Sequence, residues 1–169
     1  MPRALFALDH NYPLPILSAL SEYIPEAELV PLSEIDRRLP DLEDWQVLVA
    51  LRLHNRAWAG LVTNDADFLT SPRELAALIQ TKLAVVVAEA AGHDPLKATG
   101  LLLTHLPAVC KRLERGTPQL WHLTTVERRP NDPRAVFDDV ARRRHRSAAD
   151  LHRENDLSDE ELRADPLRM

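Results

Sequence analysis

Cysteine is almost absent from this chain of 169 residues, which contains only Cys110. A single thiol excludes a disulfide framework and a metal site built from several thiolates within one chain. Long apolar runs are missing as well: none approaches the ~20 residues that span a bilayer, and no cationic N-terminal segment precedes an apolar stretch. We therefore expect a cytoplasmic protein with no membrane partner.

An excess of positive charge is also lacking, since 21 lysines and arginines stand against 26 acids and the formal net charge is −5. This balance argues against a protein that coats nucleic acid through bulk charge, although a site built of aspartates lowers the net charge by itself. The exception is residues 127–153, which hold eight arginines against five acids. The arginines Arg142, Arg143, Arg144 and Arg146 are candidate RNA contacts, with a solvated helix face as the commoner explanation of such a run.

What the sequence does contain is a regular alternation of strand and helix patterns. Apolar runs predict buried strands at residues 4–8, 29–32, 61–63, 83–87 and 119–123. Apolar residues at helical spacing predict helices at residues 13–23, 45–54, 71–81 and 96–115. This order predicts an α/β fold, a three-layer α/β/α sandwich around a mainly parallel sheet of about five strands.

Residues 126–169 differ from the rest because they are polar, first rich in arginine and then acidic. Asp132 could cap one helix through residues 134–153, and Ser158 could start another short one. We therefore divide the chain into a domain at residues 1–125 and a helical C-terminal tail. The tail could pack on the domain, on another subunit or on nothing.

Acidic side chains follow the ends of two predicted strands. Asp9 ends the first apolar run, and Asp65 and Asp67 follow the third strand. Open α/β sheets keep their active sites at the carboxyl ends of strands, so we expect these acids to meet in one cleft. Asp44 starts a predicted helix and is the fourth candidate, although Asp41 competes for the same position, as does the adjacent glutamate.

Each acid also has a structural explanation. A lone aspartate after a strand is commonly a turn residue or a helix cap, and capping alone would account for Asp44. Asp65 and Asp67 are harder to explain in this way, because Ser71 and Glu74 already form a capping-box pattern for the next helix.

A cluster of carboxylates repels itself unless protons or cations compensate its charge. Oxygen ligands favour Mg²⁺ or Mn²⁺, and such an ion activates water and neutralises charge on a phosphoryl oxygen. We interpret Asp9, Asp65 and Asp67 as candidate metal ligands, and these three with Asp44 as candidate catalytic residues. Neighbouring polar residues that could contact substrate or orient the acids are Asn11, Thr63 and Asn64.

Two motifs resemble those of PIN-like domains. Residues 8–13 (LDHNYP) resemble the opening "L-D-x-N-x-P", and residues 62–68 (VTNDADF) resemble the signature "V-T-x-D-x-D-F". Asp44 and the apolar residues after it resemble the family helix that begins with an acid, and the resemblance covers about residues 4–125. It implies a Mg²⁺- or Mn²⁺-dependent ribonuclease with Asp9, Asp44, Asp65 and Asp67 as site acids. It also implies a homodimer and, for a VapC-type toxin, a cognate antitoxin.

Three other hypotheses compete with a nuclease. A receiver-type signalling domain needs an acidic pair after its first strand and a lysine after its fifth, and neither is present. A haloacid-dehalogenase phosphatase needs an aspartate where Asn11 stands. The more serious alternative is a PIN-like domain that has lost catalysis and serves as a binding or scaffolding module.

Overall fold

Five parallel strands form the central sheet of the computed structural model, which describes residues 3–9, 12, 14–89, 94–124 and 130–168. The strands are β1 (Ala4–Leu8), β2 (Ala27–Pro31), β3 (Gly60–Thr63), β4 (Ala84–Ala88) and β5 (Gln119–Leu123). Their order across the sheet is β2-β1-β3-β4-β5, and every neighbouring pair is parallel. The predicted three-layer α/β/α sandwich is confirmed.

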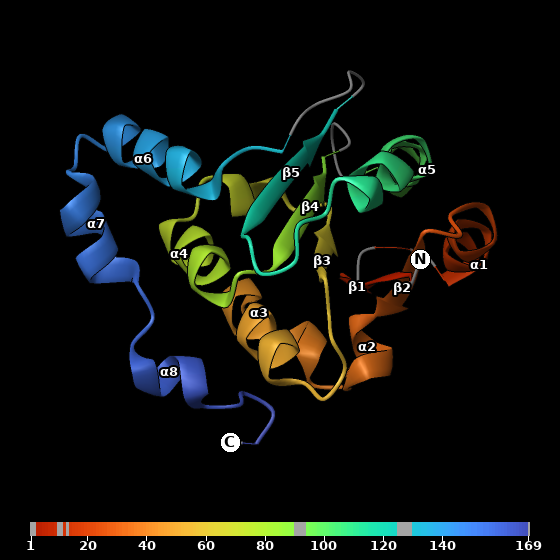
Figure 1. Cartoon of the computed structure of the whole chain (residues 1–169), viewed down its shortest axis with the longest axis horizontal. Helices are drawn as coiled ribbons and strands as arrows, with labels where there is room; N and C mark the ends of the chain where they lie inside the picture. The colour runs from red at the N-terminus through yellow and green to blue at the C-terminus, as the bar shows by residue number, and fades with distance from the viewer. Residues whose placement is uncertain (1–2, 10–11, 13, 90–93, 125–129, 169) are drawn as a thin grey trace.

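Helices cover both faces of this sheet (Figure 1). One face carries α1 (Leu14–Tyr23) and α5 (Pro95–Lys111), and the other carries α2 (Leu32–Ile35), α3 (Asp44–Leu53), α4 (Pro72–Thr81) and α6 (Pro133–Arg143). Outside α4 lie α7 (Ala148–Asn155) and α8 (Asp159–Arg163), and two 3₁₀ helices are η1 (Leu39–Asp41) and η2 (Ala66–Leu69). Across the described ranges, no helix combines the length and apolarity that crossing a membrane requires.

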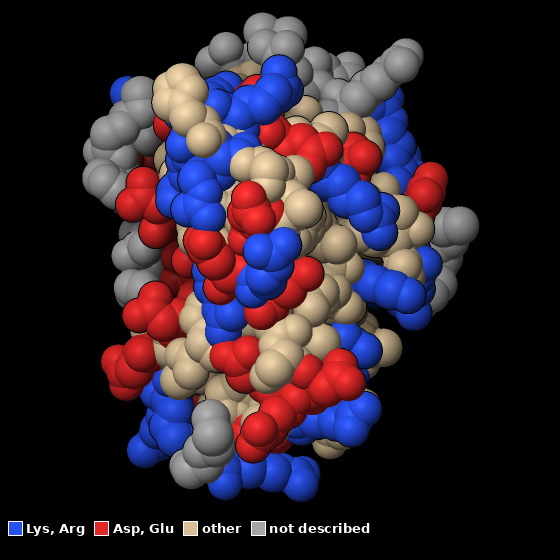
Figure 2. Space-filling view, turned by 90° about the vertical axis from the view of Figure 1, so that its left-hand side faces the viewer, with Lys and Arg blue, Asp and Glu red and all other residues tan. Residues whose placement is uncertain are grey.

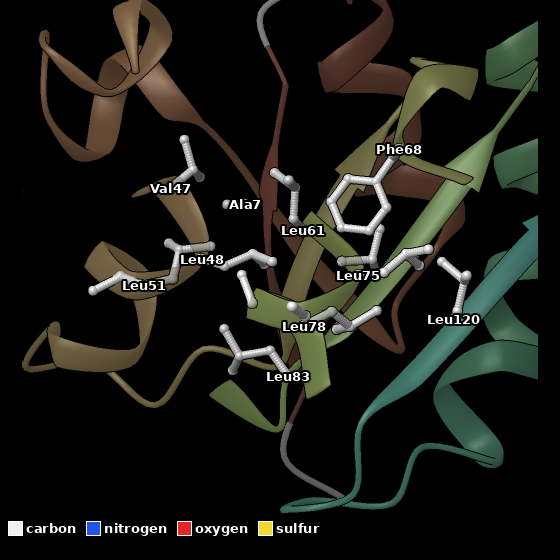
Figure 3. Packing of buried hydrophobic residues seen from close by; sticks show 14 of the residues in the cluster. Ala7, Val47, Leu48, Leu51, Leu61, Phe68, Leu75, Leu78, Leu83 and Leu120 are labelled. Atoms are coloured by element: carbon white, nitrogen blue, oxygen red, sulfur yellow. The ribbon is translucent and has the colours of Figure 1, made fainter. Parts of the chain in front are cut away.

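The strands are apolar throughout because both of their faces are buried. Successive residues of β4 alternate between two apolar clusters, so Val85 and Val87 face α3 and α4 while Val86 faces α1 and α5. Figure 3 shows the first cluster, in which Leu48 of α3 and Leu75 of α4 point toward the sheet. The two clusters stabilise the sheet from both sides and fix which strand ends lie side by side.

Two predicted helices end earlier than the sequence pattern indicates. The helix predicted at residues 96–115 is α5, which stops at Lys111 because Arg112 leaves the helical conformation. Gly116, with a φ of +80°, lies in the turn that follows. The single helix predicted at 134–153 is wrong. His145 has a φ of +53°, and its N–H bonds to the carbonyl of Arg142, as in a Schellman cap, after which a new helix begins.

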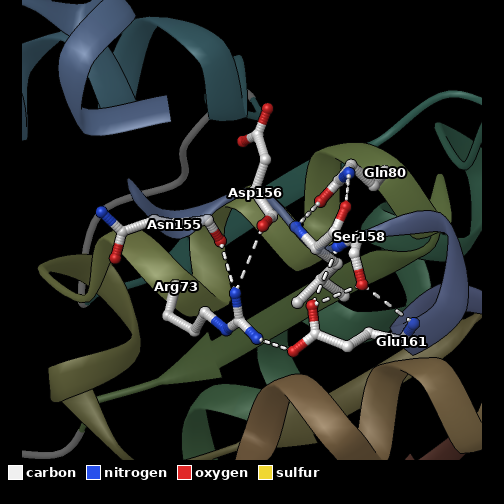
Figure 4. A network of polar contacts seen from close by, with 7 residues as sticks. Arg73, Gln80, Asn155, Asp156, Ser158 and Glu161 are labelled. Carbon is white, nitrogen blue, oxygen red and sulfur yellow. Dashed lines mark hydrogen bonds and ion pairs between the residues drawn. The ribbon is translucent and has the colours of Figure 1, made fainter. Parts of the chain in front are cut away.

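The C-terminal tail packs on the domain through α4. Arg73 donates to the backbone carbonyls of Asn155 and Asp156 at 3.1 and 3.3 Å and also pairs with Glu161 (Figure 4). Its guanidinium lies 4.6 Å from the ring centre of Trp45 on α3. Apolar side chains of the tail, with Phe137 fully buried, join the cluster on the α3 and α4 face. The tail therefore packs on the domain, which is one of the three alternatives that the sequence left open.

Gly60 permits the close approach of β3 and β4, and this predicts a strong effect of one methyl group. A Cβ at Gly60 would lie 1.7 Å from the carbonyl oxygen of Ala84, so Gly60→Ala must push the two strands apart. We expect it to lower the free energy of unfolding by more than about 2 kcal/mol, as measured by urea denaturation. Gly100 inside α5 is the matched control, because its Cβ would meet nothing within 4 Å. Gly100→Ala should raise stability by about 0.5–1 kcal/mol; equal midpoints for both variants would contradict the prediction.

The contacts of Arg73 lead to a prediction about how strongly the tail is held on the domain. We expect Arg73→Ala to lower the free energy of unfolding by about 1–3 kcal/mol, because two carbonyls and a carboxylate lose a charged donor. Thermolysin should also cut near the α7–α8 junction sooner than in wild type. Arg163→Ala is the control, since the Arg163 side chain is 81% exposed and its ion pair among the described residues is with Asp159 of the same helix. The same cleavage rate in both variants would show that Arg73 does not hold the tail.

Candidate functional site

The order of strands reverses between β1 and β3, and open α/β sheets bind ligands at such a switch point. The backbone N–H of Asp9 donates to the carbonyl of Val62 at 2.9 Å, which continues the pairing of β1 and β3 past the end of β1. The predicted proximity of the two acidic strand ends is therefore confirmed by the pairing itself.

Thr63 connects these two strand ends. Its hydroxyl donates to Oδ2 of Asp9 at 3.0 Å and accepts the backbone N–H of Asp65 at 3.0 Å. A threonine hydroxyl can do both at once, since it is a donor and an acceptor. Because the side chain is fully buried, Thr63 fixes the Asp9 carboxylate relative to the following turn and has no surface with which to reach a ligand.

The turn after β3 is the short helix η2, and Asp65 caps it. Oδ1 of Asp65 accepts the backbone N–H of Asp67 at 2.8 Å. The sequence shows a helix start at Ser71 and does not reveal this earlier cap. Asp65 thus has a structural role beside its predicted chemical one, whereas the Asp67 side chain is exposed at the first turn of η2.

The remaining polar residues of the two motifs divide into described and undescribed ones. Asn64 is buried next to Thr63. Asn11 lies outside the described residues, so its predicted contact with substrate stays a prediction. Tyr12 is described, and its hydroxyl is buried; burial and then the negative charge of Asp9 raise its pKa.

Asp44 carries the strongest electrostatic perturbation of the site. Burial raises its pKa from 3.8 to about 7, and repulsion from nearby carboxylates adds to the effect. Among the described residues, the charges that perturb this pKa are negative: Asp9, Glu74, Asp65 and Glu43, in decreasing order. The negative charges of acids at both strand ends therefore act on Asp44, whereas the convergence of all the acids in one cleft stays a prediction.

Glu43 caps α3, and this removes the purely structural explanation of Asp44. The Glu43 side chain accepts the backbone N–H of Gln46, and the Gln46 side chain accepts the N–H of Glu43 at 3.1 Å. Asp41 is exposed at the end of η1. Of the three acids that competed for this position, Asp44 is the one in the first turn of α3 that is coupled to Asp9 and Asp65.

Glu74 belongs to the same cluster, although its sequence position indicated a cap. Burial raises its pKa first, and Asp65, Glu43 and Asp67 then raise it further, while a hydrogen bond with Ser71 lowers it. Ser71 makes no side-chain hydrogen bond that caps the helix, so the predicted capping box does not form. The capping pattern accounted for Glu74 in the sequence, so nothing there indicated it as a site acid.

The arginines of the tail are largely paired with acids of the tail. Arg142 and Arg143 approach Asp139 at 3.1 and 2.7 Å, and Arg146 pairs with Glu154. Figure 2 shows the face of the molecule that these helices form, where positive and negative side chains are interspersed. The geometry fits a solvated helix face, and an RNA contact from these residues stays a prediction.

Arg144 connects the tail with the site. It donates to the backbone carbonyl of Thr70 at 3.2 Å, directly after η2. Because Asp65 caps η2 and Asp67 lies within it, the tail supports the turn that holds two candidate acids.

A divalent cation suits the chemistry of this cluster, because carboxylate oxygens are its preferred ligands. Among the described residues, only negative charges perturb the pKa of Asp44, and a cation would reduce their repulsion. The described residues nevertheless contain no ready group of three or more acidic, histidine or cysteine side chains that could hold a metal ion. A metal would therefore have to draw the acids closer together.

Comparison with known proteins gives no match to a family model, a curated protein or a solved structure. The two sequence motifs and the geometry of the site thus carry the functional argument alone.

The raised pKa of Asp44 predicts that stability falls as the pH rises. Between 3.8 and about 7 the folded state keeps a proton that the unfolded state has lost, so the free energy of unfolding decreases through this window. Above pH 7, we expect the free energy of unfolding of Asp44→Asn to exceed that of wild type by on the order of 1–3 kcal/mol. Urea denaturation in the presence of chelator measures both values. The two proteins should be nearly equal at the acid end of the window.

Asp41→Asn provides the control for this prediction, because Asp41 is an exposed acid only three residues away. The free energy of unfolding of Asp41→Asn should fall with rising pH as steeply as that of wild type. If the free energy of unfolding of wild type stays constant between pH 3.8 and about 7, Asp44 is not buried among acids.

Proposed function

We propose that this chain is a divalent-metal-dependent ribonuclease that hydrolyses phosphodiester bonds with the acids of the switch point. The observation that carries the proposal is that Asp9 and Asp65 follow the paired strands β1 and β3 and are linked through the hydroxyl of Thr63. Asp44, in the first turn of α3, experiences the negative charge of both. The PIN-like motifs around Asp9 and Asp65 support RNA as the substrate.

Each acid has a distinct part in this proposal. Asp9 and Asp65 are the principal metal ligands, and Asp67 and Asp44 complete the set. When bound, Mg²⁺ or Mn²⁺ supplies a water of lowered pKa and neutralises charge on the phosphoryl oxygen. Thr63 holds the Asp9 carboxylate through its hydroxyl, so that this ligand keeps its orientation while the others move.

Asp44 makes metal binding a proton-linked event. A carboxyl with a pKa of about 7 is partly protonated at neutral pH, and a cation nearby favours its ionised form. Binding of Mn²⁺ near pH 7 should therefore release a proton into the buffer.

Substitution of the central acids tests the catalytic assignment. We expect Asp9→Asn and Asp65→Asn to lower the rate of Mg²⁺- or Mn²⁺-dependent cleavage of an RNA panel by roughly 10²-fold or more, because each removes a ligand charge. Chelator should abolish wild-type cleavage, and excess Mn²⁺ should restore it. Asp41→Asn should cleave at the wild-type rate. Unchanged cleavage by both central variants would remove these acids from the mechanism.

One observation favours a second candidate, a PIN-like binding or scaffolding module without catalysis: the described residues hold no ready metal-binding group. Calorimetry with Mn²⁺ distinguishes the two functions, since a scaffold gains nothing from binding metal at the acids. The nuclease proposal expects binding that Asp65→Ala abolishes, with proton release seen as a dependence of the heat on buffer ionisation. A cognate antitoxin and a homodimer are proposals that rest on the PIN-like resemblance.

A further inference from the structure

Two cavities with a common wall lie at the amino-terminal edge of the sheet, opposite the strand ends that carry the candidate acids. One has a volume of about 280 Å³ and the other of about 140 Å³. Both are lined by Ala57, Trp58 and Leu83, which belong to the connection between α3 and β3 and to the residue before β4. β3 begins at this edge with Gly60, whereas Asp65 follows its other end (Figure 1).

Trp58 has a hydrogen-bond donor that lacks an acceptor. Trp58 is 7% exposed, and its Nε1 atom is buried with no hydrogen-bond partner in the described part of the chain. A buried indole N–H normally has a partner, because leaving it without one costs free energy. Packing of the ring in the apolar cluster of the α3 and α4 face accounts for its burial and not for the unpaired N–H. An acceptor supplied by a ligand would satisfy this donor.

The larger cavity presents mainly hydrogen-bond donors and positive charge. Among the described residues, its lining contains Arg52 and Arg56 and no aspartate or glutamate, and Asn55 adds an amide. His54 lines it as well. Nδ1 of His54 accepts the backbone N–H of Arg56 at 3.0 Å, so in the neutral ring Nε2 carries the proton and is a donor. The ring centre of His54 and Cζ of Arg56 lie 5.7 and 5.4 Å from the ring centre of Trp58. A negatively charged ligand with several acceptor atoms matches this lining.

Both arginines can contribute a donor to such a ligand. Arg52 donates to the backbone carbonyl of Gln80 at 2.9 Å through one nitrogen, and a guanidinium has further donors. Arg56 pairs with Glu28 of β2 at 2.7 Å, and the two side chains are 45% and 46% exposed. Because ion pairs with this exposure contribute little to stability, Arg56 can exchange Glu28 for a ligand at low cost.

We propose that this edge of the sheet binds a phosphate group, with Arg52 and Arg56 as its cationic contacts. Nε1 of Trp58 and Nε2 of His54 are the neutral donors, so the phosphate gives the Trp58 N–H the acceptor that it lacks. Phosphate suits the site better than a carboxylate, because it has more acceptor oxygens for donors on different sides and matches the fork of an arginine. The site is separate from the acids and does not depend on the proposed function.

The indole N–H signals of the whole chain in ¹H–¹⁵N correlation spectra test this proposal, since the chain has three tryptophans. Titration with inorganic phosphate at constant pH and ionic strength should shift the Trp58 signal until it saturates, and Trp58→Phe identifies that signal. Trp121 is the internal control, because its buried Nε1 also lacks a partner among the described residues but it lines neither cavity. Equal shifts of both signals, or the same shift with chloride in place of phosphate, would overturn the proposal.

Two exposed residues should change the phosphate affinity in opposite directions. Arg56→Gln should weaken binding roughly tenfold or more, since a charge-assisted contact is lost. Glu28→Gln should tighten binding, because no acid then competes for Arg56 at this position. Arg153→Gln is the matched control, since the Arg153 side chain is 77% exposed, pairs with Asp150 of α7 and lines neither cavity. Unchanged affinity in Arg56→Gln, or an equal loss in Arg153→Gln, would contradict the proposal.

The same spectra distinguish the sources of the phosphate group. Inorganic phosphate and a short single-stranded RNA are titrated separately in the presence of chelator, so that no cleavage is needed. If RNA shifts the Trp58 signal at a lower concentration of phosphate groups, the site holds a backbone phosphate. The opposite order assigns it to a free phosphate compound, and both results support a phosphate site. Acetate that binds as tightly as phosphate would assign the site to carboxylates and overturn the proposal.

Discussion

Repulsion among carboxylates is the constraint on which the candidate site depends. Pairing of β1 with β3 places Asp9 beside the turn of Asp65, and the first turn of α3 adds Asp44. Burial raises the pKa of Asp44, and the negative charges of Asp9, Glu74, Asp65 and Glu43 raise it further. The apolar clusters on both faces of the sheet offset this repulsion, because they hold the strands in register whatever charge accumulates at their ends. Groups held in this way against their own repulsion are typical of functional sites.

The architecture was predictable because its strands are buried on both faces. A strand such as β4, with every residue buried, appears in the sequence as an uninterrupted apolar run. Helix ends were less predictable, since Gly116 indicated a terminus that lies beyond the true one at Lys111. The break at His145 has no glycine to announce it, because a histidine adopts the left-handed conformation there. Local capping by backbone hydrogen bonds leaves little trace in the amino-acid pattern.

The site was predictable where it follows from strand order, and less so where it follows from helix packing. The position of Asp9 beside the end of β3 follows from parallel pairing, which the motifs indicated. Glu74 was missed because a serine three residues before a glutamate is typical of a capping box. Only the orientation of α4 against α3 brings Glu74 near Asp65 and Glu43. The sequence does not specify that orientation by any local pattern.

The tail links stability to the site, a connection that its polar composition conceals. Its helices are amphipathic, so a few buried residues such as Phe137 are enough to join them to the core on the α4 face. Arg144 then contacts the end of η2, and Arg73 lies between the tail and Trp45, the neighbour of Asp44. The tail therefore contacts the end of η2 directly and is connected to α3 through Arg73 of α4, so it supports two of the three segments that carry candidate acids. Because Phe137 and other tail residues belong to the apolar cluster on the α3 and α4 face, loosening the tail acts on that cluster as well as on the turn that carries Asp65 and Asp67.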